Sequence, residues 1–288
     1  MDVRPFRAFR FNPAIVGDPG LCIAPPYDVI DEPLQERLYR QSPYNIVRID
    51  RGKESAADSD VENVYTRAAA LLQQWLERGV LKQDPQDALY GYFQDFEVGG
   101  RPCVRKSLIG LARLEDFGPV VRPHEEILPK PMLDRLHLKR ATAAQLGLVF
   151  MLYEDPAAVV ERILDKALAP GPQGDSVLVD AVDEQGVRHR LCAVTAVEDI
   201  RQITRMMAPK PCIIADGHHR YTTGLRFAEE SGHPGARYQM MALTNVCQQG
   251  LVVLGTHRLV RALRDFDGDG LLAGLHGSFH LERWPFTP

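Results

Sequence analysis

The stretch IIADGHHRYTTGL at residues 213–225 holds the densest set of groups in the chain that could carry out chemistry. Asp216 and Gly217 follow a short apolar run, which predicts a buried strand, a sharp turn and then a helix. We expect this helix to run from about His219 to Glu230 and to end at Gly232. The side chains that open it are His218, His219 and Arg220. A helix start presents unpaired backbone N–H groups and positive dipole charge, so this position favours an anion, with phosphate as the natural guest.

Three interpretations of these residues stay open at this point: a metal site, an anion site, or polar residues at a helix start without a chemical role. Adjacent histidines on a helix point in different directions, which disfavours one metal ion held by both. Asp216 could cap the helix, hold a magnesium ion or take a proton from a hydroxyl group.

A second cluster, RPHEEILPKPMLDRLHLKR at residues 122–140, begins as a loop rich in proline and charge. It supplies His124 and Glu125 as two candidate catalytic residues that could act as a base. Lys130 and Arg135 are candidate substrate-binding cations. The spacing is not HExxH, and the further ligands that zinc requires are not evident from the sequence. The cluster therefore predicts either a loop that brings a base and cations over a substrate, or a charged loop leading into an exposed helix.

A third motif, APPYD at residues 24–28, combines two prolines with the polar side chains of Tyr27 and Asp28. A rigid loop of this kind is a common place for substrate contacts, although a plain structural turn would look the same. Neither a P-loop nor a Rossmann fingerprint occurs in the chain.

Composition describes an ordinary globular chain of 288 residues, with 45% hydrophobic and 25% charged residues and a net charge of −4. The acidic balance makes a nucleic-acid partner unexpected. Five widely spaced cysteines favour reduced thiols and a cytoplasmic location. We expect no membrane partner, because no apolar run approaches the roughly 18 residues of a spanning helix. The oligomeric state cannot be inferred.

Periodicity predicts an α+β fold with a mixed sheet and flanking helices. Hairpins are expected over residues 88–114 and 176–194, helices over residues 33–41 and 61–78, and short strands over residues 21–24 and 250–254. We expect one large unit over residues 1–288, either undivided or in two lobes with the cleft between them.

The motifs together identify the chain as a member of the family called domain of unknown function 1015. The matching segments are RPFRAFRFNP from residue 4, APPYDVI from 24, SPYNIVRI from 42, PHEEILPKPMLDRLHLKRAT from 123, IADGHHRYTTGL from 214 and GTHRLV from 255. The chain departs from the family at Ile127, where members often have Thr, and at Thr222, where they often have an acidic residue. Members tend to be longer, so we expect a C-terminal part to be missing.

The DGHHRY segment also resembles the signature of the ParB/sulfiredoxin-like fold, a group that includes kinases of free serine. The resemblance implies a ParB/sulfiredoxin-like core with insertions and a site that binds ATP or ADP together with magnesium. The nucleotide phosphates would lie at Gly217, His218, His219 and Arg220. Asp216, Glu125 and His124 would be the catalytic residues, with Asp216 also holding the metal. Tyr27, Asp28, Lys130 and Arg135 would contact a small hydroxyl substrate, for which free serine is the first candidate.

Two other functions remain possible from the sequence. The first is a nucleotide-binding switch that turns over no small molecule. The second is a metal-dependent hydrolase that uses His124, Glu125 and His218. The composite site requires that His124, Asp28 and Arg220 line one cleft.

Overall fold

The computed structural model describes residues 1–126, 129–169, 177–255, 261 and 263–282, apart from the side chains of residues 129–130. The chain forms two compact units, Met1–Leu251 and Val252–Pro288. In the second unit a short helix, α9 (Gly268–Leu275), begins after Asp267, whose side chain accepts the N–H groups of Asp269 and Gly270. None of the described helices is long and apolar enough to cross a membrane.

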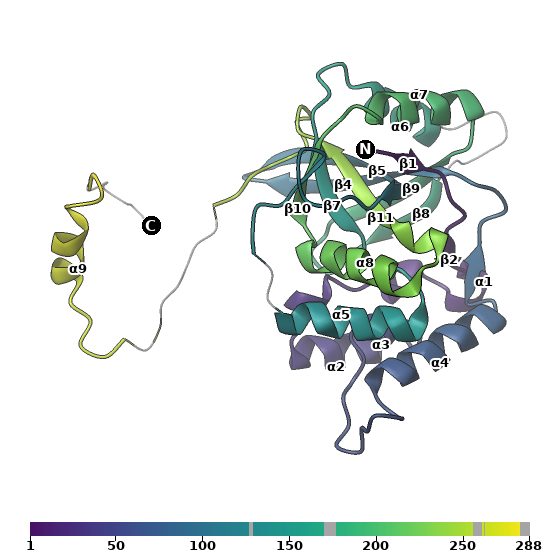
Figure 1. The fold of residues 1–288 in the computed structure, drawn as a ribbon, viewed down its shortest axis with the longest axis horizontal. Helices are drawn as coiled ribbons and strands as arrows, with labels where there is room; N and C mark the ends of the chain where they lie inside the picture. Colours follow the sequence, from purple (N-terminus) through teal and green to yellow (C-terminus); the bar gives the residue numbers. More distant parts are fainter. Residues whose placement is uncertain (127–128, 170–176, 256–260, 262, 283–288) are drawn as a thin grey trace. The chain divides into compact units, whose positions relative to one another are not determined.

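A mixed sheet forms the centre of the first unit (Figure 1), and it contains nine strands among the described residues. The strand order is β6 (Val121–Arg122), β10 (Cys212–Asp216), β7 (Val149–Tyr153), β11 (Tyr238–Asn245), β5 (Arg101–Arg113), β4 (Leu89–Val98), β9 (Arg188–Val194) and β8 (Val177–Val182), with β1 (Val3–Arg4) also paired to β5. The pairs β6–β10 and β7–β11 are parallel, whereas the other pairs are antiparallel. The predicted α+β class with a mixed sheet is therefore confirmed. Outside this sheet, β2 (Phe9–Phe11) pairs with β3 (Leu81–Gln83).

Helices lie on both sides of the sheet (Figure 1). On one side are α6 (Val159–Leu168) and α7 (Val197–Met207). On the other side α8 (His218–Ser231) packs against α5 (Pro129–Thr142), and α5 packs against α4 (Val64–Glu77). Three shorter helices complete this side: α1 (Pro13–Val16), α2 (Glu32–Gln41) and α3 (Val47–Asp50).

Side chains of the central strands point alternately to the two faces of the sheet, so that one face is apolar and the other contains polar groups. Phe93, Leu108, Met151 and Leu243 are buried in the main hydrophobic core, which α6 and α7 cover. The residue before each of them points the other way, and these four are Tyr92, Ser107, Phe150 and Ala242. The second face is the one that the site uses.

Most predicted elements are present, because their signals are local. Asp31 caps α2 through its side chain, and the two predicted hairpins are β4–β5 and β8–β9. The strand predicted at residues 21–24 is wrong: Asp18 accepts the N–H of Gly20 and starts a 3-10 helix, Pro19–Cys22. The strand predicted at residues 250–254 is also wrong, because the exposed run 252–254 pairs with no described strand.

Candidate functional site

The predicted strand, turn and helix around residue 217 are confirmed. β10 ends at Asp216, Gly217 adopts φ 93°, and α8 runs from His218 to Ser231 before Gly232. Glycine suits position 217 because its φ is left-handed, and a Cβ atom there would also lie 3.1 Å from Nε of Arg220, so that side chain would have to shift slightly. Asp216 does not cap the helix: its Oδ2 accepts from Nη2 of Arg220 at 2.6 Å instead.

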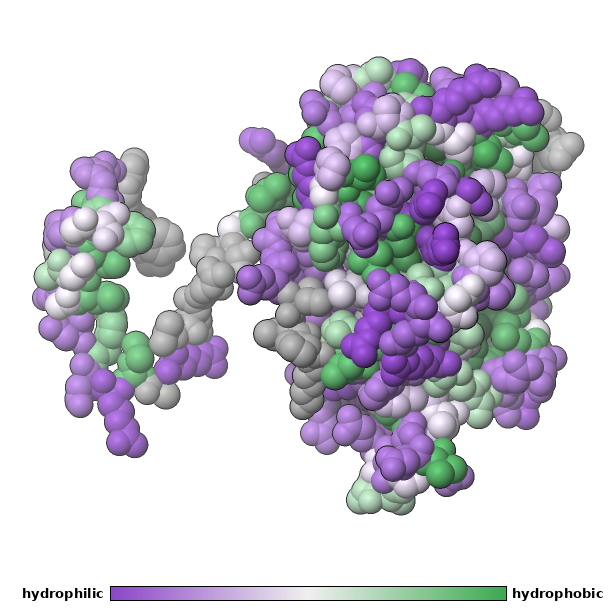
Figure 2. Space-filling view, viewed as in Figure 1, coloured by the Kyte–Doolittle hydropathy of each residue, from purple (hydrophilic) through white to green (hydrophobic). Residues whose placement is uncertain are grey.

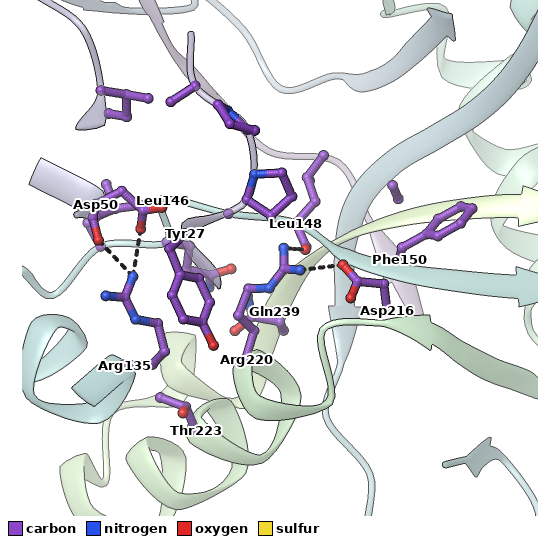
Figure 3. A pocket seen from close by; sticks show the side chains of 18 of the residues that line it. Tyr27, Asp50, Arg135, Leu146, Leu148, Phe150, Asp216, Arg220, Thr223 and Gln239 are labelled. Atoms are coloured by element: carbon purple, nitrogen blue, oxygen red, sulfur yellow. Dashed lines mark hydrogen bonds and ion pairs between the residues drawn. The ribbon is translucent and has the colours of Figure 1, made fainter. Parts of the chain in front are cut away.

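A cavity of about 410 Å³ lies beside this motif (Figure 3). Its floor is the polar face of the sheet, and its walls come from α5, α8 and the loop 24–27. Cavities of this size suit small metabolites and nucleotides. Four of the residues predicted for the site line it, namely Tyr27, Arg135, Asp216 and Arg220.

Two of the arginines in the cavity are already neutralised by carboxylates. Arg220 pairs with Asp216, and it also donates to the carbonyl oxygen of Leu148. Arg135, only 8% exposed, pairs with Asp50 at 2.9 Å and with Asp134 at 2.6 Å. Figure 3 shows both arginines pointing toward the same space, on either side of the Tyr27 ring. The guanidinium of Arg135 lies 4.0 Å from the centre of that ring, so Arg135 both positions Tyr27 and is held by it.

Two further cations of the cavity wall have only neutral partners among the described residues. Arg105 on β5 donates twice to Oε1 of Gln94, at 2.9 Å from Nε and 2.7 Å from Nη2. Lys139 on α5 donates to Oε1 of Gln239 at 2.8 Å. Burial lowers the pKa of Arg105, and it lowers the pKa of Lys139 to about 8. Because no described carboxylate pairs with them, these two groups give the cavity an excess of positive charge, which an anion would balance.

A hydrogen-bonded chain leads from the cavity wall toward the surface. The hydroxyl of Tyr92 lies 2.7 Å from Nδ1 of His189, and Nε2 of His189 lies 3.0 Å from Oδ2 of Asp183. Burial raises the pKa of Tyr92 to about 12, so Tyr92 is a hydrogen-bond donor at neutral pH. The sequence reasoning missed Tyr92, Gln94 and Arg105, although the alternation of residues along β4 and β5 is the signal that could have found them.

His124, Glu125 and His218 come together in a separate cluster that does not line the cavity. Nδ1 of His218 lies 2.9 Å from Oε1 of Glu125, and Nε2 of His218 accepts the backbone N–H of His124 at 3.2 Å. Burial is the main cause that lowers the pKa of His218. His124 therefore joins the start of α8 and not the cavity wall.

The remaining predicted site residues lie apart from the cavity wall. Asp28 is exposed in the 3-10 turn Tyr27–Val29, and Gly217 and the half-buried His219 do not line the cavity. Of the three residues expected to line one cleft, His124, Asp28 and Arg220, only Arg220 lines this cavity, and the composite site stays a prediction. The side chain of Lys130 and the whole of Ile127 lie outside what the structure describes.

Tyr221 fixes α8 against the segment that follows β5. Its hydroxyl donates to the carbonyl oxygen of Glu115 at 2.7 Å and accepts the N–H of Glu115 at 3.0 Å, and the residue is fully buried. We expect Tyr221→Phe to lower the free energy of unfolding by about 1–3 kcal/mol, because both backbone groups lose their partner. Urea denaturation would measure this loss. Tyr238→Phe is the control, since among the described residues its hydroxyl makes a single weak contact, at 3.4 Å with Asp2. An equal loss in both variants would contradict this role.

The chain matches the family model described as "Protein of unknown function (DUF1015)" over residues 3–287, and so belongs to that family. Neither a curated protein nor a solved structure gives a significant match.

Proposed function

We propose that this member of the DUF1015 family binds a nucleotide, ATP or ADP, in the cavity and transfers a phosphoryl group to a small hydroxyl acceptor. One observation carries the proposal: Arg105 and Lys139 face the cavity, and their hydrogen-bond partners within the described part of the chain are neutral amides. Phosphoryl transfer depends mainly on positioning and on offsetting negative charge, and cations fixed in a partly buried cavity supply both.

The position proposed for the phosphates differs from the one suggested by the sequence. His218 and His219 do not line the cavity, so the phosphates would lie between Arg220 and the pair Arg105 and Lys139. The Arg220–Asp216 ion pair would then stand at the reacting end of the nucleotide. This arrangement follows the general rule that desolvated cations bind oxyanions strongly.

Magnesium would fit beside Asp216. Its Oδ2 accepts a hydrogen bond from Arg220, whereas Oδ1 has no hydrogen-bond partner in the described part of the chain. One carboxylate oxygen together with phosphate oxygens is a common way of holding this ion. When bound, magnesium would neutralise phosphate charge. Arg220 holds the Asp216 carboxylate in position through Nη2. Asp50, the other carboxylate of the wall, is held by Arg135.

The proposal includes the finer fold relationship. The order strand, Gly217 turn, helix and arginine resembles the ParB/sulfiredoxin-like signature, and it supports a core of that type within the mixed sheet. It also includes a cytoplasmic location, where nucleotides are abundant and the five free cysteines would stay reduced. Free serine remains the first acceptor to test.

The experiment separates turnover from binding. The protein is incubated with ATP or ADP, magnesium and serine, and phosphoserine is measured by mass spectrometry beside nucleotide affinity by calorimetry. We expect phosphoserine to form, and Arg105→Met to abolish it. Nucleotide binding without product or hydrolysis across a panel of hydroxyl acceptors would instead establish the nucleotide-binding switch, and absence of binding would overturn the proposal. The metal-dependent hydrolase also stays a prediction from the sequence.

A further inference from the structure

A second site is formed where two parallel neighbouring strands end. β6 and β10 pair in parallel, with Ile213 beside Arg122, so the segments that follow them leave the sheet at the same edge. His124 and Glu125 come from the first segment, and His218 comes from the second. One potential ligand atom from each of these three residues lies within 4.8 Å of the others.

We propose that His124, Glu125 and His218 bind a divalent transition metal ion of the zinc class. Two imidazole nitrogens and one carboxylate are a known donor set for zinc, and imidazole favours such ions over magnesium or calcium. His124 and Glu125 are exposed, whereas His218 is buried. Since two of the three residues are exposed, the cluster is open to solvent, and water or another ligand could complete the coordination.

The orientation of His124 suits a ligand. Its Nδ1 lies 2.6 Å from the carbonyl oxygen of Ile214 and must donate its proton to it, because a carbonyl oxygen can only accept. The neutral ring then presents a lone pair at Nε2. Histidines that bind metals commonly donate their other N–H to a backbone carbonyl or carboxylate in this way, which fixes the tautomer.

His218 provides an independent indication. Its side chain is 1% exposed, yet Nδ1 has no hydrogen-bond partner among the described residues. The Oε1 atom of Glu125 lies 2.9 Å from this nitrogen. Leaving a buried polar atom without a partner is energetically unfavourable. A metal ion placed between the nitrogen and the carboxylate oxygen would satisfy both atoms.

Metal binding requires one local rearrangement. Nε2 of His218 accepts the backbone N–H of His124 at 3.2 Å, whereas a ring that binds metal through Nδ1 carries its proton on Nε2. The two N–H groups would then face each other, so this hydrogen bond opens when the metal binds. The segment is suited to such a change, because residues 122–126 are exposed.

The test measures metal binding directly and does not need enzymatic activity. Protein freed of metal with a chelator is titrated with Co²⁺, followed by visible absorption, and with Zn²⁺, followed by calorimetry. We expect one strong site per chain and the intense absorption bands of four- or five-coordinate cobalt. His124→Gln and Glu125→Gln should each weaken Zn²⁺ binding by at least about tenfold, since even the loss of an outer-shell partner typically costs roughly 10–100-fold.

Glu126→Gln is the matched control, because Glu126 is an exposed neighbour outside the cluster and should leave affinity unchanged. His124 and Glu125 are exposed, so their variants are expected to fold, and circular dichroism would verify this. Absence of a 1:1 complex would overturn the proposal, as would equal affinity in His124→Gln, Glu125→Gln and the parent protein. Nucleotide binding in the cavity is measured separately, and its failure would leave this site untouched.

Discussion

Replacing Arg105 with methionine should weaken ATP or ADP binding by at least about 30-fold, which corresponds to roughly 2 kcal/mol, the lower end of the cost of removing one partner from a desolvated charge pair. Arg105 is partly buried, and its guanidinium lies 5.2 Å from the ring centre of Phe150. Its only hydrogen-bond partner in the described residues is the neutral side chain of Gln94. An anion would therefore be its first charged partner, and methionine keeps the apolar packing while removing the charge.

Two comparisons make this result specific. Arg113→Met changes an exposed arginine of the same strand outside the cavity and should leave affinity unchanged. Arg220→Met should also weaken binding, because it removes a cation beside the proposed phosphate position and leaves the carboxylate of Asp216 without this partner. Calorimetric titration at one fixed salt concentration would measure all three variants. Equal affinities for Arg105→Met and Arg113→Met would show that the nucleotide does not use this wall.

The contrast between Arg220 and Arg105 also shows what the sequence could and could not predict. Gly217 and the residues around it form a local pattern, since one strand end, one left-handed turn and one helix start are consecutive. Such patterns depend on backbone preferences within a few residues, and this one was predicted correctly. The interaction that Asp216 makes is also local. Its carboxylate could cap α8 or form an ion pair with Arg220, and the sequence does not distinguish these two possibilities.

Arg105 depends on contacts distant in sequence. It faces the cavity because β5 pairs with β4 in a register that places it opposite Gln94, and because α5 and α8 cover that face and leave a hollow. A strand signal shows that alternate residues share a face, but not which face the helices cover. The wrong strand prediction at residues 21–24 has a similar cause, because the apolar run LCIA suits either a strand or a buried turn. The side chain of Asp18, which accepts the N–H of Gly20, stabilises the turn.

The largest pH effect should arise from Lys139. Burial alone lowers the pKa of Lys139 from its ordinary value of 10.5 to about 8, and the neighbours around its amine are Oε1 of Gln239 and the ring of Phe227 at 5.5 Å. Below pH 8 the amine is charged and attracts the anion, whereas above pH 8 it is neutral. We therefore expect ADP affinity to fall as pH rises through 8, where ADP itself no longer changes its ionisation.

Two substitutions of Lys139 test this assignment from opposite sides. Lys139→Arg keeps its charge throughout this range, so its ADP affinity should not fall between pH 7 and 9. Lys139→Met should bind ADP weakly at every pH. It should nevertheless be more stable at pH 7 by roughly 1–3 kcal/mol, because the parent protein loses stability by burying the charged amine of Lys139. The sign follows from the lowered pKa: between about pH 8 and 10.5 the unfolded chain binds more protons at this residue, so the stability of the parent rises with pH and approaches that of Lys139→Met.

Urea denaturation at pH 7 and pH 9.5 would measure the difference. A stability gap that does not narrow at high pH, or an unchanged fall of affinity in Lys139→Arg, would show that another group titrates. The same burial that makes Lys139 costly in the free protein makes it a strong anion ligand, because little water must be removed from the amine when the phosphate arrives.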